Sequence, residues 1–257
     1  MRIVRLIVGG LITFPFVLAA VLLWVPPLLC WRRRWLARLR PIWARLLLRL
    51  LKIHVRVEPP GVNTDGPALY VANHTGYLDI LVVMSISPGV FISREGIFWW
   101  PVLGQLAALG DTIFVDRRRR LSIGKSIERI RSRLRLGVGI VMFPEATSSN
   151  GDGMLPFRSP LFAVATKTDG REFPVRPLVV RYLSVAGQPI DESNRDRVYW
   201  YGDMSLPKHL WRSLTAPGIE VVVKPLPERI ITGDRKEFAG RLREEMLREL
   251  EILGTAG

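Results

Sequence analysis

Cysteine and histidine are scarce in this chain of 257 residues. The single cysteine, Cys30, excludes an internal disulfide and a cysteine-ligated zinc site or cluster. A metal site would have to combine carboxylates with the three histidines, His54, His74 and His209, and we expect none. The sequence therefore indicates chemistry that needs neither an oxidising compartment nor a metal.

Acidic residues are absent from the first 57 positions, which hold ten Arg and one Lys. Most of the chain's net charge of +14 therefore lies there, and the rest of the chain is nearly balanced. A nucleic-acid-binding protein usually spreads basic groups over its folded domain, whereas here they flank an apolar run. The distribution favours anionic lipid headgroups as partners and argues against nucleic acid.

The apolar run covers residues 6–30, 25 positions without a charge. As a helix it would be about 37 Å long, enough to span a bilayer. Pro15 interrupts it, and the pair Pro26-Pro27 should end the helix. A signal peptide is the alternative, but the apolar part is too long and no small-residue cleavage site follows it. We expect a retained membrane anchor.

Residues 31–53 alternate Trp and Leu with Arg, as in a basic amphipathic helix that lies among lipid headgroups. Pro41 should kink or split this helix. The alternative is a surface helix whose apolar stripe packs on the body. If residues 6–30 span the membrane, the five Arg at 32–40 outnumber Arg2 and Arg5, which places the body on the cytoplasmic face of the inner membrane. We divide the chain into an anchor, 1–52, and a catalytic domain, 53–257.

Beyond the anchor, segments typical of strands and helices alternate. We expect an edge strand at 53–57, further strands at 68–71, 89–93, 112–115, 139–143, 175–182, 198–201 and 219–223, and helices at 77–85, 100–109, 121–136, 159–167 and 236–253. Such alternation predicts an α/β fold, a mixed or largely parallel sheet flanked by helices.

The first informative block, Asn73-His74-Thr75-Gly76-Tyr77-Leu78-Asp79, stands where a buried strand ends and a helix begins. Ligands of α/β sheets bind at such strand ends. Asp79 in the first helical turn could hold the His74 ring while the other ring nitrogen takes a proton. A loop histidine beside a capping aspartate would have the same spacing.

Two more blocks follow strands. Gly110 to Arg117 reads as a glycine turn, a strand and an arginine, and such an arginine can grip phosphate with two hydrogen bonds. Pro144-Glu145-Ala146-Thr147-Ser148-Ser149-Asn150-Gly151 follows the strand at 139–143 and, taken alone, could be only a turn.

In this order and spacing, the three blocks resemble the motifs of the glycerolipid acyltransferase family, which includes 1-acylglycerol-3-phosphate O-acyltransferases. His74-(x)4-Asp79 is similar to the first motif, Gly110 to Arg117 to the second, and Phe143-Pro144-Glu145-x-Thr147 to the third. The strand at 173–178 resembles the fourth. The resemblance covers about residues 50–185.

The resemblance implies transfer of a fatty acyl group from a coenzyme A or acyl carrier protein thioester to a lysolipid hydroxyl at a membrane. No cofactor would be bound. His74 would be the general base and Asp79 its orienting partner. The acceptor site would include Gly110, Arg117, Glu145, Thr147 and Ser148, with Asn73, Arg94 and Arg158 as further candidates.

One departure concerns the acceptor. Lysophosphatidate enzymes usually read Glu-Gly-Thr-Arg at the third motif, whereas here Ala146 replaces the Gly and Ser148 the Arg. Ala146 is harmless there only if its φ is negative. The missing cation makes the motif more similar to members that use lyso-ornithine lipid or lysophosphatidylcholine.

Two other functions fit parts of the sequence. A membrane-bound thioester or lipid hydrolase could share the His/Asp pair, although the chain has no Gly-x-Ser-x-Gly elbow. A catalytically silent membrane scaffold would not need His74, Asp79 and Glu145. Acyl transfer to a lysolipid panel discriminates among the three.

Overall fold

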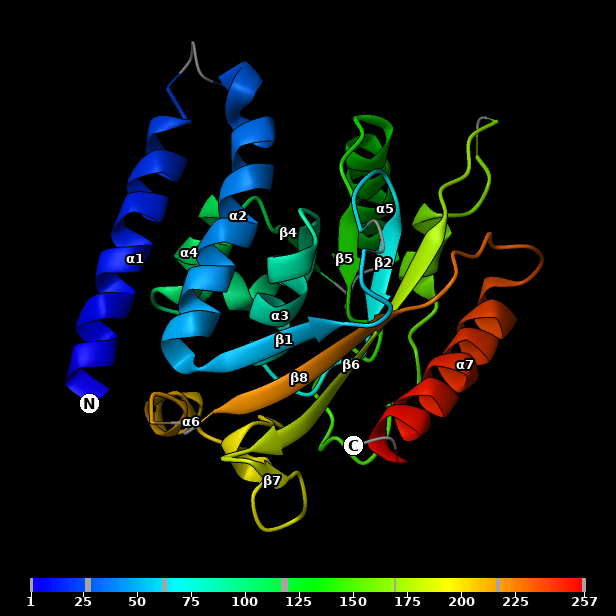
Figure 1. Ribbon diagram of the computed structural model, residues 1–257. Helices are drawn as coiled ribbons and strands as arrows, with labels where there is room; N and C mark the ends of the chain where they lie inside the picture. Colours follow the sequence, from blue (N-terminus) through cyan, green and yellow to red (C-terminus); the bar gives the residue numbers. More distant parts are fainter. Residues whose placement is uncertain are drawn as a thin grey trace.

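The computed structural model describes residues 2–25, 29–61, 64–116, 120–168, 170–215 and 218–255 (Figure 1). A mixed sheet forms the centre of the body, with the strand order β1-β8-β6-β2-β5-β3-β4 and with β7 paired to β6. The strands are β1 (Ile53–Val57), β2 (Leu69–Ala72), β3 (Val90–Arg94), β4 (Ile113–Val115), β5 (Ile140–Met142), β6 (Val175–Val185), β7 (Gln188–Pro189) and β8 (Ile219–Pro225). Strand β6 pairs antiparallel with β7 and β8, and the other pairings are parallel. The expected fold class is confirmed.

Helices cover both faces of the sheet because alternate strand residues point to opposite sides. On one face, α2 (Leu29–Leu51) and α3 (Leu78–Ile86) pack with Tyr70, Val141 and Leu178. On the opposite face, Leu69 and Ile140 pack with α5 (Arg120–Arg135), the 3₁₀ helix η3 (Pro160–Val164) and α7 (Arg235–Thr255). Strand β2 is covered on both sides, and all four of its residues are buried.

The two N-terminal helices, α1 (Arg2–Leu22) and α2, lie side by side at one end of the molecule (Figure 1). Helix α1 is long and apolar enough to cross a membrane by length and composition. Most of its apolar side chains are exposed, among them Ile7, Leu11 and Phe14 at 58–67%. Helix α1 ends before Pro26-Pro27, as the sequence predicts.

Helix α2 packs on the body through Ala44, Leu48 and Leu51. For this side of the helix, the alternative stated above is confirmed: its apolar stripe packs on the body. Pro41 does not split α2. Of the two expected effects of Pro41, a kink or a split, the split is wrong. Buried residues on both sides of Pro41, such as Leu36 and Ala44, hold the helix to its neighbours. Trp31, Trp35, Ile42 and Leu46 are exposed on its outer side.

Two arginines of α2 are buried, contrary to a helix that gives its whole basic face to lipid headgroups. Arg40 is 2% exposed and donates to the carbonyl oxygens of Gly110, at 2.8 Å, and Pro88, at 2.5 Å. Burial lowers the pKa of Arg40 to about 10. Arg32 forms an ion pair with Asp111 at 3.0 Å. These arginines join the anchor to the body.

Three expected elements differ from the structure. The prediction of a strand at 198–201 is wrong, because these aromatic residues follow the 3₁₀ helix η4 (Arg195–Arg197) and pack against the body: Trp200 N donates to Thr75 O at 2.9 Å. The helix expected at 159–167 is only η3. The helix expected at 100–109 is preceded by the 3₁₀ helix η2 (Glu95–Trp99) and starts later, as α4 (Leu103–Leu109), because Pro101 and a tight turn precede it. Helix α6 (Leu206–Ser213) was not expected.

Candidate active site

The first block lies at the carboxyl end of β2, between β5 and β6 in the sheet. His74 follows this strand, and Asp79 lies in the first turn of α3. Asn73 fixes the strand end, because its Nδ2 donates to Val180 O at 2.9 Å and its Oδ1 accepts from Val180 N at 2.7 Å. Both polar ends of Asn73 therefore bind strand β6, which makes it a structural residue.

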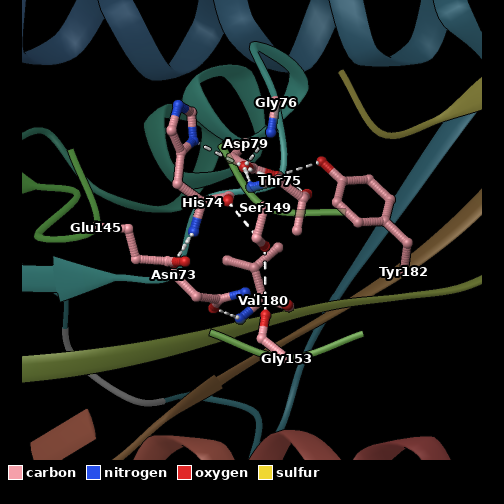
Figure 2. A network of polar contacts seen from close by, with 10 residues as sticks. All are labelled: Asn73, His74, Thr75, Gly76, Asp79, Glu145, Ser149, Gly153, Val180 and Tyr182. Carbon is pink, nitrogen blue, oxygen red and sulfur yellow. Dashed lines mark hydrogen bonds and ion pairs between the residues drawn. The ribbon is translucent and has the colours of Figure 1, made fainter. Parts of the chain in front are cut away.

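His74 Nδ1 lies 2.9 Å from Asp79 Oδ2 (Figure 2). The His74 side chain is 17% exposed and that of Asp79 is 1% exposed. Since Asp79 accepts at Nδ1, we assign the tautomer with the proton on Nδ1, which leaves Nε2 to accept a proton. The ring stacks on Phe143, with centroids 4.2 Å apart, so its orientation is fixed by packing as well.

The Asp79 carboxylate accepts four further hydrogen bonds. Oδ2 accepts from Thr75 N at 2.5 Å and Gly76 N at 2.9 Å. Oδ1 accepts from Thr75 Oγ1 at 3.1 Å and Tyr182 Oη at 2.8 Å (Figure 2). Burial and the Asp79 charge raise the Tyr182 pKa well above its usual range, so this hydroxyl stays a donor. A buried charge surrounded by donors can hold the His74 ring and stabilise its protonated form.

The third block clamps the backbone of His74. Glu145 Oε1 accepts from His74 N at 2.7 Å, and Glu145 Oε2 accepts from Leu155 N at 2.7 Å. On the other side, Ser149 N donates to His74 O at 2.8 Å. Burial raises the pKa of Glu145 to about 7. Both carboxylate oxygens of Glu145 bind the chain itself, so its contacts are those of a residue that positions His74.

Ala146 has a φ of +67°, so the condition under which alanine would be harmless there, a negative φ, is not met. This is the left-handed region, which glycine adopts freely and alanine only at a cost of about 1–2 kcal/mol. Ala146 and Thr147 are exposed and Ser148 is half-buried, next to the buried Glu145. The third block therefore turns sharply away from the core directly after Glu145.

The second block lies partly at the junction with the anchor. Gly110 ends α4, and its carbonyl oxygen accepts from Arg40. Asp111, with a φ of +70°, accepts from Arg32 and from Arg133 of α5 at 3.0 Å. Arg117 lies outside the described residues. The described part of the block serves here as a connection between α2, α4 and α5.

The other candidates are two exposed arginines. Arg94 ends β3. Arg158 donates its backbone N–H to Pro144 O at 2.9 Å, which places it beside the third block. Within the described ranges, no three His, Cys, Asp or Glu residues gather as a metal site requires.

Sequence reasoning missed Tyr182, Ser149 and the backbone of Leu155. Ser149 stands within the third block, but no role was assigned to it, because its contact is with the backbone of His74. Tyr182 occupies an ordinary position in a strand, and no local signal separates it from a core aromatic residue.

Comparisons with known proteins show the family of the chain. A family profile described as "Acyltransferase" matches residues 54–181. A lyso-ornithine lipid O-acyltransferase from Brucella abortus is 34% identical over 223 residues, covering 84% of this chain and 82% of the relative. One from Rhizobium meliloti is 34% identical over 195 residues, covering 74% of this chain and 65% of the relative, a little under two thirds of its length.

Two further similarities involve proteins named for another acceptor. A 1-acyl-sn-glycerol-3-phosphate acyltransferase from Neisseria meningitidis is 30% identical over 179 residues, covering 70% of this chain and 67% of the relative. The crystal structure of the 1-acyl-sn-glycerophosphate (LPA) acyltransferase PlsC from Thermotoga maritima aligns with a TM-score of 0.65 at 20% identity, covering 98% of both chains. The last similarity concerns the fold alone.

Proposed function

Because the chain belongs to the acyltransferase family, we propose that it transfers a fatty acyl group from a thioester to the free hydroxyl of a lysolipid, with His74 as the general base. The observation that carries the proposal is the contact between His74 Nδ1 and the buried carboxylate of Asp79 at 2.9 Å. It leaves Nε2 of a ring that is partly exposed at a strand end, where a hydroxyl can reach it.

In the proposed reaction, His74 Nε2 takes the proton of the lysolipid hydroxyl as the oxygen attacks the thioester carbonyl carbon. The carbon–sulfur bond then breaks, and the leaving thiolate takes the proton from the imidazolium. The products are the acylated lipid and the free thiol of coenzyme A or acyl carrier protein. Asp79 stabilises the charged ring throughout. The step passes through no acyl-enzyme, and the sole cysteine, Cys30, lies in the anchor.

We propose that the acceptor site prefers lysophosphatidate weakly or not at all over zwitterionic lysolipids such as lyso-ornithine lipid. Ser148 stands where an arginine would meet a phosphate monoester, which carries nearly two negative charges and gains most from cationic forks. Several relatives are named for lyso-ornithine lipid and others for 1-acylglycerol-3-phosphate. Ser148→Arg should shift the ratio of kcat/KM toward lysophosphatidate, by at most about 1.5–3 kcal/mol.

We further propose that the hairpin of α1 and α2 attaches the enzyme to the membrane, with α1 lying along the body. Near its start, Arg5 Nη1 donates to Leu214 O at 2.6 Å. Near its end, Ala20 and Leu23 pack with Leu36 and with Leu109 of α4. A helix held by the body at both ends cannot cross a bilayer with that body on one side. The exposed face of α1 would enter one leaflet, and the basic residues of the hairpin favour the cytoplasmic surface of the inner membrane.

The test is the product list formed when membranes containing the protein meet a radiolabelled acyl thioester and a panel of lysolipids. Both palmitoyl-coenzyme A and the matching acyl carrier protein thioester are supplied, which identifies the donor. Label should appear in acylated lipids and depend on the acceptor. Release of free fatty acid without a lysolipid would instead support a hydrolase, and no turnover with any acceptor would support a scaffold.

A further inference from the structure

The segment between β3 and α4 exposes four large apolar side chains. Trp99 is 77% exposed, Val102 69%, Phe98 39% and Leu103 37%. A group of apolar residues so close together on a surface marks a site of interaction with a membrane or another protein. The segment is not part of the active site described above.

The backbone of this segment is fixed in a strained conformation. Leu103 N donates to Pro101 O at 2.7 Å, which closes a three-residue turn around Val102. Val102 has φ 65° and ψ −54°, near the rare classic γ-turn and unfavourable for a β-branched residue. A Cβ on Gly104 would lie 2.1 Å from Phe98 O, so α4 starts directly against η2. Strain of this kind persists where the surrounding structure imposes it, often at functional sites.

Helix α4, which begins at the exposed group, lies next to the α1–α2 hairpin. Leu109 of α4 packs on the cluster of Ala20, Leu23 and Leu36, and Figure 1 shows α4 beside the hairpin. Trp24, just after α1, is 56% exposed. The exposed apolar surface of the hairpin therefore has α4, and the apolar segment that leads into it, as a neighbour in the body.

The segment also leaves the sheet at the edge that carries His74. Strands β2, β5 and β3 are parallel neighbours, and η2 follows the carboxyl end of β3 as His74 follows that of β2. The ring of Trp100 contacts that of Trp200, with centroids 6.2 Å apart. Trp200 N in turn donates to Thr75 O, next to His74.

Arginines lie beside the apolar group. A cavity of about 380 Å³ there is lined by Phe98, Trp99, Arg129 and Arg133, together with the acidic Glu95. Arg133 is paired with Asp111. Arg94 is exposed just before η2. Aromatic residues next to arginines are typical of protein surfaces that enter the headgroup layer of an anionic membrane.

We propose that the β3–α4 segment is a second membrane contact, which inserts Phe98, Trp99, Val102 and Leu103 into the lipid surface and sets the His74 edge of the sheet against it. The inference rests on the proposed membrane attachment through the hairpin. It extends that attachment to the catalytic body, so that a lysolipid hydroxyl in the bilayer is presented to His74 without leaving the membrane.

The first experiment measures insertion without using activity. In a Cys30→Ser background, Trp99→Cys is labelled with the environment-sensitive fluorophore NBD and reconstituted in vesicles of phosphatidylglycerol and phosphatidylcholine. Ile252→Cys, on the exposed side of α7, is the matched control at 53% exposure. The label at 99 should shift to the blue and be quenched by lipids brominated on their acyl chains. Emission equal to that of the control would overturn the proposal.

The second experiment connects insertion with turnover. Trp99→Ser/Val102→Ser is compared with Leu136→Ser/Ile252→Ser, two apolar residues exposed elsewhere. The first variant should raise the apparent KM for a long-chain lysolipid in vesicles at least fivefold and leave kcat/KM for a monomeric short-chain lysolipid unchanged. Equal KM values in the two variants would contradict the proposal. Absence of acyl transfer in the unsubstituted protein would refute the proposed function, while the labelling experiment would still decide insertion.

Discussion

The Tyr182 hydroxyl donates to Asp79 Oδ1 at 2.8 Å, on the oxygen opposite the one that faces His74. Tyr182 is 1% exposed, and it reaches Asp79 from strand β6. The carboxylate is thus fixed from a distant part of the chain, on the side away from the histidine. Tyr182 acts through Asp79 and is a positioning residue.

Tyr182→Phe removes this hydrogen bond and should lower kcat about threefold to tenfold, the scale of a hydrogen bond of ~0.7–1.4 kcal/mol. KM should stay the same, because the Tyr182 side chain is 1% exposed and its hydroxyl binds Asp79, which leaves it no surface for the substrate. Tyr70→Phe is the matched control, since its hydroxyl binds Gly66 O and Arg176 instead. A change in KM with constant kcat, or an equal effect in the control, would argue against the positioning role.

Asp79→Asn should keep the local geometry and lose the charge. An amide oxygen in the place of Oδ2 can still accept from Thr75 N, Gly76 N and His74, and the two hydroxyls at Oδ1 can rotate. The lost charge-assisted bond should lower kcat/KM by about 10- to 150-fold, equivalent to ~1.5–3 kcal/mol. Kinetics of Asp152→Asn, an exposed aspartate, supply the control. Full activity of Asp79→Asn would show that its charge plays no part.

Glu145 should make the free energy of unfolding depend on pH. Its pKa rises from 4.5 to about 7 on folding because the carboxyl is buried. The folded state then binds more protons at Glu145 than the unfolded state over this range. The contribution of Glu145 to stability is therefore greatest below pH 4.5 and falls by about 3 kcal/mol as the pH rises to 7. Denaturant titrations at several pH values measure the slope.

Glu145→Gln is the matched variant for that slope. It removes the titration, so its stability should change less over the same pH range. Its amide leaves one backbone N–H of His74 or Leu155 without an acceptor, at a cost of about 1–3 kcal/mol at every pH. An unchanged slope would show that Glu145 does not titrate in this range.

Ala146→Gly should stabilise the protein by about 0.5–1 kcal/mol. Glycine relieves the strain of a φ of +67°, and part of the gain is lost to its greater freedom in the unfolded chain. Ala186→Gly, also exposed with a φ of +58°, should behave alike. Ala107→Gly within α4 should destabilise by about 1 kcal/mol. Unfolding midpoints of the three variants measure these effects. A loss of stability in all three would contradict the strain assigned to Ala146.

The contacts that could be predicted from the sequence are local. His74 and Asp79 are five residues apart across a strand-to-helix turn, so the boundary of β2 and α3 alone brings them together. The buried strands and the charged helices were also predictable, because each is defined by a pattern of apolar and charged residues within its own short segment. The strand expected at 198–201 shows the limit of this reasoning, because its three consecutive aromatic residues pack against the body and pair with no strand there.

The remaining parts of the site depend on how distant segments pack. Tyr182 lies 103 positions after Asp79, and Glu145 lies 71 positions after His74. A place for Glu145 at the acceptor site stays a prediction. Its observed partners are backbone N–H groups, and a backbone partner leaves no trace in side-chain patterns. Likewise, the basic face of α2 gave no sign that Arg32 and Arg40 would turn inward to Asp111 and Gly110.

The most direct test of the central claim is the kcat/KM of His74→Ala with a labelled acyl thioester and the best lysolipid acceptor, in vesicles. Loss of the general base should lower it about 10²- to 10⁴-fold, while expression and membrane association stay as in the unsubstituted protein, because the hydrogen bonds of His74 described above involve neither α1 nor α2. A value within about threefold of the unsubstituted protein's would remove His74 from the reaction and contradict the account.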